Sequence, residues 1–564
     1  MRKAVLESWN FNVQKRVESN SKKVKSKIVV MPMREMTNGT AMLAILRMKR
    51  VLLLSAGTVC TVLTVLGREV PADWNSHSEW FMFAPAFVLQ RLPGAASYRC
   101  TVRPDGGEPL VFGVTNAVAQ IPGDVWASLP RTGYVTFEVR GLAADGRDLG
   151  PALSRRFWRS ATYRPGHYPL RAKPYRVAVL AGYDWLFRQP EVDHLLKTGK
   201  PDPSHPKNGY PTKILSALAV AMLHYAEICP VQAVRARQVA RAAVDWLMAN
   251  SQPASAPLAG FPPTYAFAQG NECWEKYRGQ QMLLYPAYAG NACLAYYGFS
   301  QEKRYLAAAE AIAETYVRLQ GEDGTWTLKV RESDGSPVGP NRLFPLGVAE
   351  FLDEMAARTR RTAYKAAADR AVRFVMEGPV VDWNWEGQFE DVEPSKRYCN
   401  LTKHPACDTA LWLLRTRPDD AGARALARRL LTFAEDQFVC WERPYDGAVP
   451  PANSERPGWC THYGQWHVPS VTEQYECNVP IDASAAKLIR TYLAMYDAEG
   501  NPLDLAKART LGDSMTRMQL ADGRLPTFWH NDRFDARKDW WNCLCASLSA
   551  LELLEQHETG GNSK

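Results

Sequence analysis

The segment Leu306-Ala-Ala-Ala-Glu-Ala-Ile-Ala-Glu-Thr-Tyr-Val317 repeats apolar side chains at intervals of three and four residues. That spacing places them on one face of an α-helix, which predicts a helix packed against a core. The same pattern recurs from about residue 172 onward. It predicts twelve helices, at about 174–190, 212–227, 231–249, 281–298, 302–319, 342–357, 361–376, 404–415, 419–436, 480–496, 503–519 and 540–556.

The connections between these helices alternate between short and long. Short connections give antiparallel helix hairpins. The long connections always precede the first helix of a pair, and they lie near 250–280, 320–341, 377–403, 437–479 and 520–539. If the first helix pairs with the last, six hairpins close into a ring with all long loops at one end. The sequence therefore predicts a mainly α fold, an (α/α)6 toroid whose mouth is built from loops.

Residues 80–160 follow a different pattern. Alternating or continuous apolar segments, separated by Pro-Asp-Gly-Gly and Ala-Asp-Gly-Arg turns, predict strands near 96–102, 109–114, 133–142 and 155–159. This pattern is typical of a small antiparallel β-sandwich. We therefore predict a β-sandwich domain over 78–165 and the toroid over 170–558.

The first 67 residues carry the whole net charge of +9, with twelve Lys or Arg against three Asp or Glu. The remainder has 56 of each sign, so no basic surface for nucleic acid is expected. Within this segment Lys49-Arg50 precede sixteen uncharged residues, the pattern of a secretory signal. Because a membrane span needs about 20 residues, we expect residues 48–67 to direct export to the periplasm or the exterior. An uncleaved signal anchor, attached to a membrane, is the alternative, and residues before Met48 form an N-terminal extension.

The cysteine pattern does not predict a metal site. The chain has twelve cysteines at irregular spacing, and neither Cys399-x4-His404-x2-Cys407 nor Cys543-x-Cys545 has a matching second half. Buried, unpaired cysteines are the simpler interpretation. We therefore expect no metal and no other cofactor.

The loop Asp382-Trp-Asn-Trp-Glu-Gly-Gln-Phe-Glu-Asp391 concentrates two tryptophans and four carboxylates in ten residues. Indole rings stack on the apolar faces of sugars, while carboxylates bind hydroxyls or transfer protons. The structural alternative is that the indoles fill a gap between helices and the acids are solvated. Similar loops recur before other helices, which favours a carbohydrate site.

From these loops and the helix order, the C-terminal two-thirds of the chain resembles the six-hairpin glycosidase superfamily, and in particular glucuronidase-like or unsaturated-uronyl hydrolases. Trp126-Ala-Ser-Leu-Pro followed by the segment 133–142 resembles fibronectin type III-like modules that precede catalytic domains. The resemblance implies a secreted hydrolase of poly- or oligosaccharides, with uronic acids in the substrate.

Hydrolysis of a glycosidic bond requires two carboxyl groups on either side of that bond. Glu390 and Glu476 are the leading pair, and Glu386, Asp391 and Glu473 are the other candidates. The structural alternative for each is a helix cap or a salt bridge.

Other residues of the mouth loops are expected to bind the sugar. They are Glu272, Trp274, Tyr277, Arg278, Trp326, Trp383, Trp385, His404, Trp466, His467, Tyr475, Trp529 and His530. At least two of the six tryptophans among them should stack on sugar rings.

Two other functions fit the same loops. A polysaccharide lyase would use Tyr475 or His467 as base, with Asn478 neutralising a uronate. A glycan-binding protein without activity would need the aromatic residues but not the cluster of glutamates.

Overall fold

A computed structural model describes residues 73–266, 275–390, 394–442, 467–475, 478–529 and 539–560. The predicted export signal at 48–67 lies outside these residues. Across the described ranges, no helix combines the length and apolar character needed to cross a membrane.

The N-terminal part of the described chain is built from two β-layers of unequal size. The strands are β1 (Trp80–Phe81), β2 (Ala86–Val88), β3 (Ser97–Pro104), β4 (Leu110–Val114), β5 (Val118–Gln120), β6 (Gly133–Leu142) and β7 (Asp148–Arg159). Five of them form a sheet in the order β1-β7-β6-β3-β4, in which only β1 and β7 are parallel. The second layer is the β2–β5 ribbon, whose Phe87 packs 5.6 Å from Phe137 and 6.1 Å from Phe157 of the sheet. Because this layer has two short strands, the fibronectin type III-like sandwich is not confirmed.

All twelve predicted helices are present. They are α4 (Tyr175–Phe187), α6 (Pro211–Ile228), α7 (Ala233–Ala249), α8 (Pro286–Ser300), α9 (Lys303–Leu319), α10 (Leu346–Thr359), α11 (Thr362–Glu377), α13 (Lys403–Thr416), α14 (Ala421–Phe438), α15 (Asp482–Glu499), α16 (Pro502–Met518) and α17 (Trp541–Gly560). The helix expected from residue 281 begins later because Gln280–Met282 form β8, which pairs with β9 (Lys329–Arg331).

Several short elements were not predicted from the sequence pattern. They are α3 (Gly123–Ser128), α5 (Pro190–Thr198), α12 (Pro379–Asp382), β10 (Val439–Cys440), β11 (Ser470–Val471) and the 3₁₀ helices η1 (Asp73–Ser76), η2 (Pro206–Gly209) and η3 (Pro230–Gln232). Each is too short to show a periodic apolar pattern.

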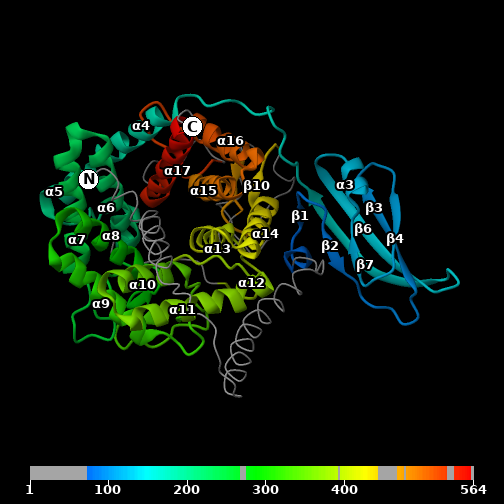
Figure 1. Ribbon diagram of the computed structural model, residues 1–564, viewed down its shortest axis with the longest axis horizontal. Helices are drawn as coiled ribbons and strands as arrows, with labels where there is room; N and C mark the ends of the chain where they lie inside the picture. The colour runs from blue at the N-terminus through cyan, green and yellow to red at the C-terminus, as the bar shows by residue number, and fades with distance from the viewer. Residues whose placement is uncertain are drawn as a thin grey trace, which may run out of the picture. The chain divides into compact units, whose positions relative to one another are not determined.

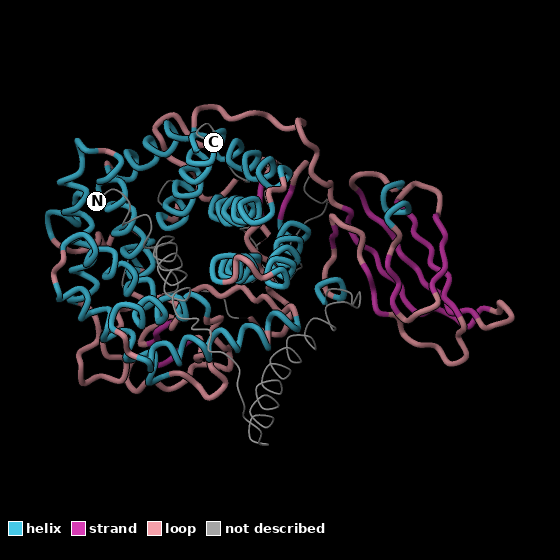
Figure 2. Tube along the Cα trace, in the orientation of Figure 1, coloured by secondary structure: helices cyan, strands magenta, loops and turns pink. Residues whose placement is uncertain are grey.

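The twelve long helices form two concentric layers of a closed ring (Figure 1). The inner layer runs α6, α8, α10, α13, α15 and α17, each in contact with the next, and α17 returns to α6. The outer partners are α7, α9, α11, α14, α16 and α4, so the first helix does pair with the last. Figure 2 shows the same ring of helices joined by loops. The (α/α)6 toroid is therefore confirmed, and the long loops lead into the N-terminal ends of the inner helices.

Glycine allows neighbouring helices to approach closely where the ring closes. A Cβ placed on Gly182 of α4 would lie 2.5 Å from a methyl carbon of Leu548 on α17, which is fully buried. Gly290 of α8 is similarly crowded by the Phe351 ring of α10. Since a packed core cannot yield that space, these two glycines set how closely the helices pack.

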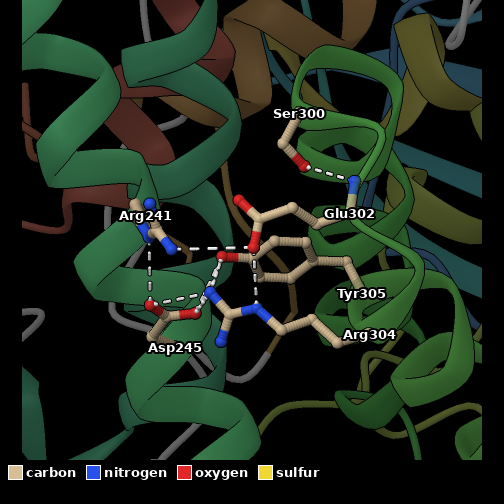
Figure 3. A network of polar contacts seen from close by, with 6 residues as sticks. All are labelled: Arg241, Asp245, Ser300, Glu302, Arg304 and Tyr305. Carbon is tan, nitrogen blue, oxygen red and sulfur yellow. Dashed lines mark hydrogen bonds and ion pairs between the residues drawn. The ribbon is translucent and has the colours of Figure 1, made fainter.

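Outside the core, a polar network joins α7 to α9 (Figure 3). Arg304 contacts Asp245 at 2.9 Å and Glu302 at 3.0 Å, and the Tyr305 hydroxyl donates to Asp245 at 2.9 Å. Arg241 lies 3.5 Å from Asp245. These charged groups are more than a third exposed, so each pair contributes about 1 kcal/mol or less.

We predict that Gly182→Ala lowers the free energy of unfolding by about 1–3 kcal/mol, because the new methyl group overpacks the contact with Leu548. Gly298→Ala in α8 is the matched control, since its Cβ would meet nothing within 4 Å. That change should raise stability by about 0.5–1 kcal/mol, because alanine favours a helix. Urea denaturation measures both. A Gly182→Ala protein as stable as the control would contradict the close approach.

Candidate active site

A buried ion pair lies where the long loops meet the inner helices. Glu390 is only 1% exposed, and Lys213 Nζ, from the first turn of α6, donates to its two carboxylate oxygens at 2.9 and 3.1 Å. The Tyr285 hydroxyl, directly before α8, also donates to this carboxylate. A buried carboxylate needs such charge compensation and hydrogen bonds. Glu390, which was predicted from the sequence, is therefore held by residues at the N-terminal ends of two inner helices, α6 and α8.

Two further contacts fix this pair in place. The Tyr265 hydroxyl donates to the backbone carbonyl of Glu390 at 2.6 Å. Lys213 Nζ lies 4.0 Å from the ring centre of Trp540, a cation–π distance. Burial raises the pKa of Tyr285 well above 10, and the Glu390 carboxylate raises it further, so the phenol keeps its proton and serves as a donor.

His404, the second residue of α13, lies beside this pair. Its ring is 6.4 Å from that of Phe389, the residue before Glu390. Burial lowers the pKa of His404 well below 6.5, and the charges of Lys403, Lys487 and Lys213 lower it further. The imidazole is therefore neutral at pH 7 and has one nitrogen able to accept a proton.

Tyr288 and an ion pair form a part of the site that water reaches. Tyr288 of α8 is 39% exposed, yet desolvation raises its pKa, and the charges of Asp408 and Glu390 raise it further. A side chain that is reached by water but largely enclosed by protein is typical of a cavity wall. Asp408 of α13 forms an ion pair with Lys487 of α15, and the Asp408 side chain is 40% exposed. Residues of α6, α8, α13 and α15 therefore share one polar site.

Glu473 belongs to the same region. Lys403 Nζ donates to its backbone carbonyl at 2.6 Å, and burial lowers the pKa of Lys403 to about 7 against the opposing charge of Glu473. On α17, burial raises the pKa of the Cys543 thiol, with smaller contributions from Asp482, Glu473 and Glu390. Glu473 and Glu390 therefore both lie within electrostatic range of the Cys543 thiol.

Glu386 lies in a separate polar cluster. Asn384 donates to its carboxylate at 2.7 Å, and the neighbouring charges are those of Asp382 and Arg397. Burial raises the pKa of Glu386, with a further contribution from Asp382. Six predicted site residues lie outside the described part of the chain: Glu272, Trp274, Asp391, Trp466, Glu476 and His530.

The four described tryptophans of the predicted set have the burial of core residues. Trp326, Trp385 and Trp529 are 0% exposed, and Trp383 is 4% exposed. The indole N–H of Trp326 donates to the Tyr316 carbonyl at 2.8 Å. These rings pack beneath the loops, so stacking on sugar would require the loops to move. The expectation of two stacking tryptophans now depends on the two that are not described.

Tyr277 and Arg278 lie just before β8, the strand that pairs with β9. Tyr277 is buried, with Lys329 Nζ 3.9 Å from its ring centre. Arg278 is exposed, pairs with Glu275 at 2.5 Å, and borders a cavity of about 530 Å³ that β8 and β9 help to line. The structure therefore places Arg278, a predicted sugar-binding residue, at this pocket.

Tyr475 and His467, the predicted lyase bases, occupy different places. The Tyr475 hydroxyl donates to Gln437 Oε1 at 2.5 Å, and its ring lies 5.0 Å from that of Trp80. It therefore packs where α14 meets the β-strands. The backbone N–H of His467 donates to the Trp529 carbonyl at 3.1 Å. Neither residue is among the neighbours of Glu390 described above.

Sequence reasoning missed Lys213, Tyr285, Tyr288 and Lys487. Lys213 and Tyr288 could have been found from the sequence, because Pro211 and Pro286 mark the first positions of α6 and α8. A polar residue two positions later lies in the first turn of an inner helix, at the mouth. For Lys487, six residues into α15, the sequence offered no such mark. Among the described residues, no group of three His, Cys, Asp or Glu side chains is arranged to hold a metal ion.

No family model and no curated protein matches the chain. Several solved structures are similar to it. A family 76 glycoside hydrolase from a bovine Bacteroides thetaiotaomicron strain is 11% identical, with a TM-score of 0.44, over 84% of this chain and 96% of that one. A cellobiose 2-epimerase from Spirochaeta thermophila is 14% identical, with a TM-score of 0.45, over 69% and 100%. An unsaturated glucuronyl hydrolase specific for heparin is 9% identical, with a TM-score of 0.42, over 68% and 98%.

By name, all three are enzymes that act on carbohydrates. At such identities a similarity concerns the fold alone. The fold of this chain is established by its own helix order and ring closure.

We predict that Lys213→Met lowers the free energy of unfolding by about 3–5 kcal/mol, because it leaves the buried Glu390 carboxylate without its cation. Adding Glu390→Gln should recover part of that loss. Lys487→Met is the control, since its partner Asp408 is half-exposed and the pair is worth about 1 kcal/mol or less. Urea denaturation of the four proteins measures the coupling. Equal losses for the two lysine variants would contradict the assignment.

A second prediction concerns pH. The folded pKa of His404 lies well below its unfolded value of about 6.5. Below pH 6.5 the unfolded chain therefore binds more protons, and stability falls by up to about 1.4 kcal/mol per pH unit from this residue. His404→Gln should remove that slope. Unfolding free energies of both proteins between pH 5 and 7 test it, and parallel curves would show that His404 is not desolvated.

Proposed function

We propose that the protein is a glycoside hydrolase that cleaves uronic-acid-containing poly- or oligosaccharides at the mouth of the toroid. The observation that carries this proposal is the Glu390 carboxylate, held by Lys213 and Tyr285, with a second glutamate, Glu473, in electrostatic range of the same thiol, Cys543. Hydrolysis of a glycosidic bond requires two carboxyl groups. In a hydrolase, Glu390 would be the base or nucleophile, because a lysine-paired carboxylate is suited to accept a proton or attack carbon.

The acid would come from the connection between β11 and α15. Glu473 lies in its described part, and the predicted Glu476 lies three residues further on. The stereochemical outcome depends on the distance from Glu390 to the acid: about 5–5.5 Å for retention and about 6.5–9.5 Å for inversion.

The charge of the site supports an anionic sugar. Lys213, Lys403 and Lys487 all act on His404. The Lys487–Asp408 pair is reached by water, so a sugar carboxylate could bind Lys487 there. Cations in an enclosed site attract carboxylates and raise their local concentration. The proposal includes export directed by residues 48–67, since polysaccharides are encountered outside the cytoplasm.

One observation favours a second candidate, a polysaccharide lyase. His404 lies beside Phe389 and has an unprotonated ring nitrogen at pH 7, so it is better placed than Tyr475 to accept the proton beside a uronate carboxyl group. Its lowered pKa makes it a weaker base than an exposed histidine. Such a reaction leaves an unsaturated sugar and incorporates no water.

A panel of plant, algal and host oligosaccharides, with product mass analysis in ¹⁸O-labelled water, tests the proposal. Hydrolysis adds one water, and therefore one ¹⁸O atom, to the products. Glu390→Gln should reduce turnover by about 10²–10⁴-fold while binding, followed by affinity electrophoresis, persists. Asp245→Asn, in the network of Figure 3, is the control and should keep full activity.

Other outcomes point to the alternatives. A product that shows the ultraviolet absorption band of an unsaturated uronate and lacks ¹⁸O would identify a lyase. Binding without turnover in the unaltered protein, across the whole panel, would identify a glycan-binding protein. Near-normal turnover by Glu390→Gln would overturn the assignment of this residue.

A further inference from the structure

We propose that the segment preceding the β-strands, residues 73–78, is a positioning element for the loop that carries Glu390, with Trp74 and His77 as its contact residues. Its kinetic consequence rests on the proposed function above, whereas its structural consequence does not. The contacts of Trp74, Asp436, Trp383 and His77 carry the inference.

Trp74 is packed into the toroid. It lies in η1 and is 7% exposed. Its ring centre is 4.7 Å from that of Trp383, in the loop that carries Glu390, and 5.2 Å from that of Phe433 on α14. A residue near the start of the described chain therefore touches a loop more than 300 positions away.

Asp436 of α14 anchors this segment. Its Oδ2 accepts hydrogen bonds from Trp74 Nε1 at 3.0 Å and from Gln437 Nε2 at 2.6 Å. Its Oδ1 accepts from the backbone N–H groups of Met82 at 2.7 Å and Phe83 at 2.9 Å. Four donors surround a buried carboxylate, so its hydrogen-bonding capacity is filled. The indole of Trp74 is thereby held in one orientation against the loop.

The loop needs this support because its backbone is unfavourable at the contact points. Trp383 has φ 59° and Tyr398 has φ 61°, left-handed values that large side chains rarely adopt. Trp74 covers Trp383. The His77 ring stacks on Tyr398 with centroids 4.0 Å apart and an angle of 16°. Both strained loop residues are thus covered by an aromatic side chain from the same six-residue segment.

Backbone contacts carry this constraint toward Glu390. The Thr402 N–H donates to the Trp385 carbonyl at 2.8 Å, and the Gly387 N–H to the Asn400 carbonyl at 2.6 Å. These two hydrogen bonds join Trp385 and Gly387, which lie between Trp383 and Glu390, to Thr402 and Asn400, which follow Tyr398. A Cβ on Gly387 would lie 2.6 Å from Gln474, so this connection has little room to shift. Loosening Trp383 should displace Glu390 from Lys213 and Tyr285.

Hydrogen exchange measured by mass spectrometry tests the structural part. Trp74→Ala should accelerate exchange of peptides from 383–402 by tenfold or more, and Trp74→Phe, which keeps a ring against Trp383, should restore most of the protection. Trp185→Ala is the matched control, because Trp185 is also 7% exposed but lies on α4. It should leave these peptides unchanged.

The kinetic part uses the substrate found by the panel. A displaced base should lower kcat with little change in KM, so Trp74→Ala should lose at least tenfold in kcat while Trp185→Ala keeps it. Unchanged exchange in a folded Trp74→Ala protein, or equal acceleration in both variants, would overturn the proposal. If Trp74→Ala does not fold, His77→Ala replaces it, since His77 is exposed, and acceleration near Tyr398 is then the expected result.

The two proposals fail in different ways. Accelerated exchange combined with a Glu390→Gln variant that stays active would support the positioning of the loop and reject the role of Glu390. A drop in kcat without altered exchange would reject the positioning role and leave the function intact.

Discussion

The closure of the ring by α17 is the constraint on which the rest of the structure depends. This last helix contacts α4, the first of the toroid, and also both of its inner neighbours, α6 and α15. Without that contact six hairpins would form an open array with two exposed apolar ends. With it, the N-terminal ends of the inner helices face one site. Gly182 makes the closure possible, because any larger residue would meet the buried Leu548.

The electrostatics of the site follow from this arrangement. Lys213 reaches Glu390 from the first turn of α6, while His404 and Lys487 come from the first two turns of α13 and α15. Helix N-termini carry a partial positive charge, which favours anions at the mouth. The same enclosure that stabilises the ion pair also keeps His404 neutral, because it excludes water from charged groups. One geometry thus supplies a fixed carboxylate and, near the neighbouring Phe389, an uncharged imidazole.

The β-domain is joined to this ring through buried polar groups as well as aromatic packing. Asp436 collects donors from residues 74, 82 and 83, and Trp80 Nε1 donates to the Gln437 carbonyl at 2.7 Å. Such bonds are directional, so they fix the orientation of the segment that covers Trp383 and Tyr398. The strained loop and the N-terminal segment therefore form one unit, although they are far apart in sequence.

The amino-acid sequence alone determined the helices, their pairing and the ring, because apolar periodicity and loop length are local properties that survive in the linear chain. It also indicated Glu390, since four acids and two tryptophans within ten residues of a long loop are unusual. The roles of the other site residues depend on burial, which the sequence does not show. Trp326, Trp385 and Trp529 look like subsite residues in sequence but lie in the core, and Lys213 looks like an ordinary helix residue but neutralises Glu390. Which side chain meets which depends on contacts between distant segments, and those exist only once the ring has closed.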